Sequence, residues 1–315
     1  MTLPFRLALV GAGRIGAYHA HTLAGSEQVR IAAVVDPRPA AAAAIGDPDT
    51  RRHGSIDELL DAGGVDGVLL AAPTVLHKQL VERLADSGLP LLSEKPCGRT
   101  SEEAYAIAEV VERSGAFLRV AFWRRFVEDL AQLRERVARG ELGGVATAFS
   151  SQWDEQPPSA AFRDPRSSGG LIVDTAVHDF DLLRWVTGQE IVEAHGFASE
   201  VTYDAPVPGD PESASLVVRL SGGGTALVSV GRRHAPGEVQ RLWLVGTEDA
   251  ADVPYIARSE DPAMDVAFRA QTEEFARVAA GGDAAGSQLA TIGDAIAALE
   301  AAELTSRALE RDESR

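Results

Sequence analysis

The chain has 315 residues, 45% of them hydrophobic and 24% charged, which is typical of a globular protein long enough for two domains. Its formal net charge of −17 argues against binding to nucleic acid or to an anionic membrane, where a basic patch is expected. A single cysteine, Cys97, excludes an intrachain disulfide. The apolar run 7–12 is too short for a signal peptide and no stretch approaches membrane-spanning length, so we expect a cytoplasmic protein.

Up to about residue 121, short apolar segments alternate with helical ones, which is the pattern of a doubly wound parallel sheet. The predicted strands are 5–10, 29–35, 66–71, 90–93 and 117–121. The predicted helices are 14–24, 37–45, 55–62, 76–87 and 101–114. The sequence therefore predicts an α/β dinucleotide-binding Rossmann domain over residues 1–121.

From residue 145 onward the segments are longer and alternate apolar with polar residues. The predicted strands are 194–203, 214–220, 225–230 and 241–245, with a Gly-rich hairpin turn at 221–224 and helices at 263–280 and 288–310. This pattern indicates an α+β domain, residues 122–315, on an open and largely antiparallel sheet that binds substrate. Because an exposed apolar sheet face is unusual in a monomer, we expect a homodimer or homotetramer.

A Gly-rich loop, Gly11-Ala12-Gly13-Arg14-Ile15-Gly16, joins the first strand to the first helix. The first glycine permits a tight turn, the second lets the backbone approach a pyrophosphate, and the third lets the helix pack close to the strand. The pyrophosphate then lies on the N–H groups that open the helix, beside Arg14 and Ile15. The loop predicts dinucleotide binding.

Asp36 follows the second strand, 20 residues after Gly16, where a carboxylate can accept both hydroxyls of the adenosine ribose. A carboxylate there repels a 2′-phosphate, so NAD is favoured over NADP. Arg38 leaves NADP open, because its guanidinium could pair with that phosphate. The alternative for Arg38 is a solvated residue of the first helical turn.

Lys95 is one of only two lysines, with Lys78, among 30 basic residues, and it stands in Glu94-Lys95-Pro96 directly after an apolar run. A lysine can have its pKa lowered and join a proton-transfer network, whereas arginine stays protonated. We interpret Lys95 as a catalytic residue. The alternative is a solvated lysine at the end of a strand.

Asp174 and His178 lie four residues apart in a predicted helix, so both project from one face. A histidine titrates near neutrality and suits a base that removes a hydroxyl proton, and a nearby carboxylate stabilises its charged form. The alternative is a metal site in which His178 and either Asp174 or Asp181 supply two ligands. No third ligand has convincing spacing, so we predict no metal.

With these motifs together, the chain resembles the glucose-fructose oxidoreductase, inositol dehydrogenase and MocA (Gfo/Idh/MocA) family, and segments 121–126 and 169–181 resemble its inositol dehydrogenase branch. The resemblance implies that Lys95 and His178 flank the reacting hydroxyl and that Asp174 supports His178. It also implies cofactor contacts from the turn after the predicted strand 66–71 and from the end of the predicted strand 90–93. These residues are Pro73, Thr74, His77, Glu94 and Lys95.

Three features depart from the family pattern and leave the substrate open: Val127, Phe268 and the loop 152–168. Arg124 and Trp153 are candidates for substrate contact, with Asp174 and His178. For Arg124 and Arg125 we favour pairing with local acids over substrate binding.

The expected function is NAD-dependent hydride transfer to or from a secondary alcohol of a cyclic polyol or sugar, above all an inositol, as in myo-inositol 2-dehydrogenases. The alternatives are an aldose or pyranose dehydrogenase, a keto-sugar reductase, and a non-catalytic protein that responds to NAD or sugar. A proton relay of Lys95, Asp174 and His178 argues against the last, because a sensor has no need of one.

Overall fold

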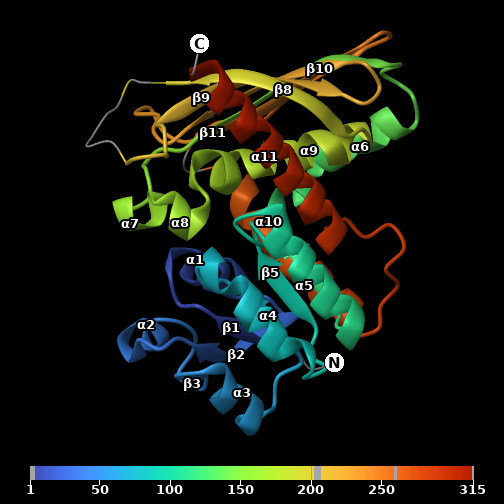
Figure 1. Ribbon diagram of the computed structural model, residues 1–315. Coiled ribbons are helices and arrows are strands. Elements are labelled where there is room, and N and C mark those ends of the chain that lie inside the picture. Colours follow the sequence, from blue (N-terminus) through green and yellow to red (C-terminus); the bar gives the residue numbers. More distant parts are fainter. Residues whose placement is uncertain (1–3, 200, 202–206, 259–260, 314–315) are drawn as a thin grey trace. The chain divides into compact units, whose positions relative to one another are not determined.

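The computed structural model describes residues 4–199, 201, 207–258 and 261–313 (Figure 1). The chain divides into two compact units. The N-terminal unit comprises Met1–Gly98, Glu102–Trp123 and Asp265–Ala295, and the second unit comprises Arg99–Ser101, Arg124–Met264 and Ile296–Arg315. None of the described helices is long and apolar enough to cross a membrane.

The N-terminal unit is built on a six-stranded parallel sheet with the strand order β3-β2-β1-β4-β5-β6. This confirms the predicted Rossmann sheet, in which the chain order reverses beside β1. The strands are β1 (Phe5–Val10), β2 (Val29–Val35), β3 (Arg51–His53), β4 (Gly67–Leu70), β5 (Leu91–Glu94) and β6 (Leu118–Ala121). The helices that follow them are α1 (Arg14–Leu23), α2 (Pro39–Ala43), α3 (Ile56–Ala62), η1 (Thr74–Leu76), α4 (His77–Ala85) and α5 (Ser101–Ser114).

The edge strand β3 is absent from the sequence prediction, because its three residues are two arginines and a histidine and so form no apolar run. It forms because Arg52 pairs in parallel register with Val34 of β2. Tertiary pairing thus overrides weak local propensity.

Helix α10 (Ala263–Ala279) packs against the Rossmann sheet, although the sequence prediction groups it with the second domain. Phe275 of α10 contacts Phe5 edge-on, with ring centroids 6.2 Å apart, and lies 6.1 Å from Phe117. These aromatic contacts assign most of α10 to the N-terminal unit, a long-range association that the local sequence pattern does not reveal.

The second unit is built on a six-stranded sheet in which only β7 and β10 are parallel neighbours, as the open and largely antiparallel prediction requires. The strands are β7 (Val145–Trp153), β8 (Ile191–Ala198), β9 (Ser213–Leu220), β10 (Thr225–Gly231), β11 (Val239–Gly246) and β12 (Ala250–Ile256), in the spatial order β12-β11-β7-β10-β9-β8. Residues 200, 202 and 203 of the predicted strand 194–203 lie outside the described residues.

The helical segments that complete the chain are the 3₁₀ helix η2 (Trp123–Phe126), α6 (Glu128–Ala138), α7 (Ala160–Arg163), α8 (Pro165–Ser168), the π-helix η3 (Ile172–Ala176), α9 (Val177–Thr187) and α11 (Ile292–Glu313). In Figure 1, α6 and α9 run beside each other along one face of the second sheet. The Ser150 hydroxyl of β7 donates to the Asp179 carboxylate of α9 at 2.5 Å, which identifies the covered face.

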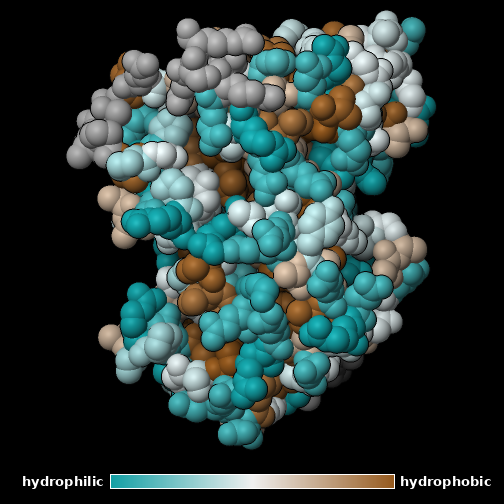
Figure 2. All heavy atoms as spheres, in the orientation of Figure 1, coloured by the Kyte–Doolittle hydropathy of each residue, from teal (hydrophilic) through white to brown (hydrophobic). Residues whose placement is uncertain are grey.

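The opposite face of this sheet carries a row of apolar residues, three of them exposed and Phe149 half-buried. Trp243, Phe149, Leu227 and Val217 are cross-strand neighbours on β11, β7, β10 and β9. Trp243, Leu227 and Val217 are 44%, 47% and 46% exposed. The view in Figure 2 shows mainly hydrophilic surface with small hydrophobic groups, in keeping with the charge of −17.

Candidate active site

The Gly-rich loop lies between β1 and α1 at the carboxyl edge of the Rossmann sheet, and two of its glycines are required by close backbone contacts. Gly11 has a φ of 102°, and a Cβ atom there would lie 2.5 Å from the carbonyl oxygen of Ala71. A Cβ atom on Gly16 would lie 2.0 Å from the carbonyl oxygen of Gly11. Larger side chains at either position would push α1 away from the strands.

Gly13 has a different role, because a Cβ atom there would meet nothing within 4 Å. It stands at the N-cap of α1 in an extended conformation. The amide groups of the first helical turn, which include those of Arg14 and Ile15, have no partners within the helix. The open space beside Gly13 leaves room for a pyrophosphate to approach the backbone at the start of this helix.

Asp36 directly follows β2 and is held by two neighbours. Its Oδ2 accepts hydrogen bonds from the Ala12 amide at 2.8 Å and from Arg38 Nη2 at 2.9 Å. Its Oδ1 accepts from Arg38 N and Nε, each at 2.9 Å. The hydrogen bonds from Arg38 lower the pKa of Asp36 from 3.8 to about 2, so the carboxylate is ionised at neutral pH. Asp36 thus links the Gly-rich loop to the position expected for the ribose.

Glu94 ends β5 immediately before Lys95 and forms a buried contact with a histidine that the sequence analysis does not identify. His19 Nε2 of α1 lies 2.6 Å from Glu94 Oε1, while the Lys95 amide donates to Glu94 Oε2 at 3.1 Å. Phe268 of α10, one of the departures from the family pattern, packs on the His19 ring at a centroid distance of 4.9 Å. This packing fixes the strand end that carries the half-buried Lys95.

His77 is buried at the start of α4, and both of its ring nitrogens face backbone carbonyls. Nδ1 lies 3.0 Å from Pro96 O and Nε2 lies 2.9 Å from Ala72 O. Burial lowers the pKa of His77, although both carbonyls oppose that shift. Pro73 and Thr74 form the turn between these contacts, at the N-cap and first residue of η1. His77 therefore ties this turn to the segment that contains Lys95.

In the second unit, Asp174 lies in the π-helix η3 and His178 is the second residue of α9. The predicted helix is present, but it opens with a wide turn at the very position of the carboxylate. Both residues are largely buried, at 8% and 6% exposed. Arg232, at the end of β10, donates through Nη1 to Asp174 Oδ2 at 2.8 Å and to Thr175 Oγ1 at 3.2 Å.

Arg124 and Arg125 form buried ion pairs with residues of α9. Arg124 Nη1 lies 3.2 Å from Asp179 Oδ1, and Nη2 donates to Gln152 Oε1. Arg125 donates to Asp181 through Nε at 3.0 Å and Nη2 at 2.5 Å. These contacts support pairing with local acids over substrate contact for both arginines, and they engage Asp181, the alternative metal ligand.

Trp153, a candidate for substrate contact, lies on the face of β7 opposite the one that contacts α9. Ser150 and Gln152 of β7 face α9 through Asp179 and Arg124, and side chains alternate along a strand. Trp153 accordingly faces the open side of the sheet, where Nε1 donates to Ser229 Oγ of β10 at 3.1 Å. Its substrate contact stays a prediction that the α9 side of the sheet does not support.

The structure thus groups the predicted residues by unit. The cofactor candidates and Lys95 belong to the N-terminal unit, and Asp174 and His178 belong to the second. Sequence reasoning misses Arg232, although the buried alternation of Ala226, Val228 and Val230 on β10 extends to position 232. A charged residue at a buried position signals a partner.

Two further features of the described residues bear on the chemistry. No group of three or more His, Cys, Asp and Glu residues there is arranged to hold a metal ion. Burial raises the pKa of Cys97 to about 12, so this thiol is not a nucleophile at neutral pH.

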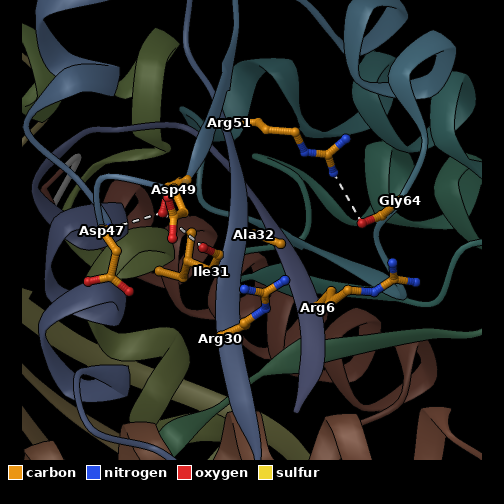
Figure 3. A pocket seen from close by; sticks show the side chains of 9 residues that line it. Arg6, Arg30, Ile31, Ala32, Asp47, Asp49, Arg51 and Gly64 are labelled. Atoms are coloured by element: carbon orange, nitrogen blue, oxygen red, sulfur yellow. Dashed lines mark hydrogen bonds between the residues drawn. The ribbon is translucent and has the colours of Figure 1, made fainter. Parts of the chain in front are cut away.

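A pocket of about 400 Å³ lies at the amino ends of β1, β2 and β3 (Figure 3). Arg6, Arg30 and Arg51 line it, and Arg51 Nη2 donates to the carbonyl of Gly64 at 3.1 Å. Because dinucleotides bind at the carboxyl ends of parallel strands, this pocket is not the cofactor site.

Residues 5–122 match the oxidoreductase family with an NAD-binding Rossmann fold, and residues 130–252 match the GFO/IDH/MocA C-terminal domain. The chain is similar to the rhizopine catabolism protein MocA of Rhizobium meliloti, with 41% identity covering 98% of this chain and 96% of that protein. It is 34% identical to the inositol 2-dehydrogenase of Rhizobium meliloti (strain 1021), over 78% of this chain and 74% of that protein.

Two solved structures have the same fold over almost the whole chain. The myo-inositol dehydrogenase of Corynebacterium glutamicum is 26% identical with a TM-score of 0.84, and 98% of each chain is covered. The scyllo-inositol dehydrogenase of Lactobacillus casei, solved with NAD(H) and scyllo-inositol, is 23% identical with a TM-score of 0.85 and 98% coverage of each chain. The chain belongs to the Gfo/Idh/MocA family of oxidoreductases and carries that family's NAD-binding Rossmann domain.

Proposed function

We propose that this oxidoreductase uses NAD to oxidise a secondary alcohol of a cyclic polyol, and that the polyol is an inositol. The observation that carries the proposal is the buried Asp174, held on a π-turn four residues before His178. A carboxylate near the His178 imidazole stabilises its protonated form, which suits a base that accepts a hydroxyl proton. Relatives named inositol 2-dehydrogenase support the choice of polyol.

Each predicted site residue has its own role in the proposed reaction. NAD, when bound, would supply the acceptor for the hydride that leaves the substrate carbon. The Gly-rich loop holds the pyrophosphate and Asp36 holds the adenosine ribose. His178 accepts the proton of the reacting hydroxyl, and Lys95 donates a hydrogen bond to the same oxygen as negative charge develops on it. Asp174 orients the imidazole and stabilises its charged form.

A panel of alcohols tests this function. The purified protein is incubated with NAD and myo-inositol, scyllo-inositol, a rhizopine, glucose and galactose, and NADH absorbance is followed. We expect the highest kcat/KM with an inositol. Oxidation of glucose with no oxidation of either inositol would replace the inositol proposal with an aldose dehydrogenase.

A rhizopine is a second candidate substrate, because the relative with 41% identity along almost the whole chain is named for rhizopine catabolism. The two candidates are separated by kcat/KM within the same panel. A rhizopine oxidised at least tenfold more efficiently than either inositol, about 1.4 kcal/mol of transition-state binding, would assign it as the substrate.

We also propose a cytoplasmic location, which fractionation of the source cells tests.

A further inference from the structure

Arg232 is the fully buried centre of an ionic cluster that includes the proposed catalytic carboxylate. It is 0% exposed, and its guanidinium divides its hydrogen bonds between two acids. Nη1 donates to Asp174 Oδ2 and Nη2 donates to Asp210 Oδ1, each at 2.8 Å. Burial alone would lower the pKa of Arg232, but the charges of Asp174 and Asp210 outweigh it and raise the pKa. Arg232 is therefore a permanent cation beside Asp174.

Asp210 competes with Asp174 for this cation and is itself held by a second arginine. Arg163 donates through Nε to Asp210 Oδ2 at 2.6 Å, and its Nη2 lies 3.0 Å from Glu212 Oε1. All of these side chains are nearly or fully buried. Electrostatic interactions are strong in such surroundings, so a change in any one charge is felt by its neighbours.

Several other charged groups on α9 and on the elements packed against it have partners of their own. On α9 itself, Asp179 pairs with Arg124 and also accepts from Ser150 of β7, and Asp181 pairs with Arg125. From α6, Arg134 donates through Nε to the carbonyl of Trp185 at 3.2 Å. From η3, Asp174 faces Arg232. Asp174 and its partner Arg232 carry charges next to the start of α9, four residues before His178, so a change in either charge should act on the His178 ring.

We infer that Arg232 is a positioning residue that fixes the orientation of the Asp174 carboxylate and partly neutralises it, and thereby sets the pH at which His178 becomes a base. This inference rests on the proposed role of His178. A carboxylate without its counter-ion stabilises an imidazolium more strongly. Loss of the Arg232 charge should keep His178 protonated to higher pH, and loss of the Asp210 charge should do the opposite.

The test follows the His178 ring directly by NMR of protein labelled with ¹³C-histidine, as a function of pH. The chain has seven histidines, and the His178 resonance is the one that disappears in His178→Asn. We expect its titration midpoint to move to higher pH in Arg232→Gln and to lower pH in Asp210→Asn. If Arg232→Gln does not fold, Asp210→Asn decides alone, because it keeps the cation and changes only its competitor.

Arg219→Gln is the matched control, since Arg219 is an exposed arginine of β9 that donates to Glu193 Oε2 at 2.7 Å. It should leave the midpoint unchanged. A midpoint shared by the wild type and the folded variants would overturn the inference. Activity is a second, separate measurement. If the enzyme is active, Arg232→Gln should lower kcat/KM about tenfold at pH 7, and kcat/KM should recover at higher pH. A wild type that oxidises no polyol refutes the proposed function, while the ring titration still judges Arg232.

Discussion

Arg38 donates a hydrogen bond to each carboxylate oxygen of Asp36, from Nε to Oδ1 and from Nη2 to Oδ2, each at 2.9 Å. Hydrogen bonds from Arg38 hold the pKa of Asp36 at about 2 instead of 3.8. Because the pKa of Asp36 is lower in the folded protein than in the unfolded chain, the ionised carboxylate stabilises the fold at pH values above about 4. This stabilisation is lost as the pH falls from about 4 to about 2.

Asp36→Ala should weaken NAD binding by about 1.5–3 kcal/mol, the usual contribution of a hydrogen bond to a charged group. It should also improve NADP relative to NAD, because the repulsion of a 2′-phosphate is gone. Fluorescence titration with both cofactors measures the two changes. Asp66→Ala is the control, since Asp66 accepts an equivalent pair of bonds from Arg6 at the amino edge of the sheet. An unchanged cofactor preference in Asp36→Ala would mean that Asp36 does not contact the ribose.

Lys95→Arg keeps the positive charge but replaces a compact ammonium with a wider, planar group. We expect kcat to fall while the dissociation constant for NAD changes little, because the substituted group acts on the substrate oxygen. Steady-state kinetics and NAD titration separate the two. Lys78→Arg, at the exposed lysine that pairs with Glu82, should behave as the wild type. Near-normal turnover in Lys95→Arg would return Lys95 to a solvated strand-end role.

His178→Ala should lower the oxidative rate by about 10²–10⁴, the range for loss of a general acid–base group. In the wild type the rate should rise with pH as the ring loses its proton, and this dependence should vanish in the variant. Rates measured across the pH range test both points. His195→Ala, at an exposed histidine of β8, is the control. A flat wild-type profile would point to a different base.

The predictability of the structure depends on how local each signal is. The alternation of β9 and the glycines before α1 act within a few residues, so most strands of the two sheets and the cofactor loop follow from the sequence, whereas β3, β7 and β12 are not among the predicted strands. The Asp174 and His178 spacing is equally local, but the π-turn leaves no pattern in residue types.

Contacts between distant residues explain what the sequence does not reveal. Arg163 and Asp210 are separated by 47 positions and His19 and Glu94 by 75, so their pairing depends on the completed fold. The face occupied by Trp153 depends on where β7 begins in register with β10 and β11.

The apolar row Trp243, Phe149, Leu227 and Val217 predicts that the open face of the second sheet is covered by another copy of the chain. Multi-angle light scattering at micromolar concentration should give a dimer or tetramer, and Leu227→Glu should reduce the mass. Val266→Glu, at a 63% exposed residue of α10, is the control. A wild-type mass of 33.3 kDa, that of one chain, would contradict this assembly.

The proposed function requires the protein to remove a hydride from a ring carbon of an inositol. The direct measurement uses myo-inositol and scyllo-inositol deuterated at every ring carbon, with mass spectrometry of the cofactor after incubation with the enzyme and NAD. We predict one deuterium in the reduced cofactor from at least one inositol, with a turnover that falls by about 10²–10⁴ in His178→Ala. Absence of deuterium from the cofactor with both inositols, from protein shown by titration to bind NAD, would contradict the claim.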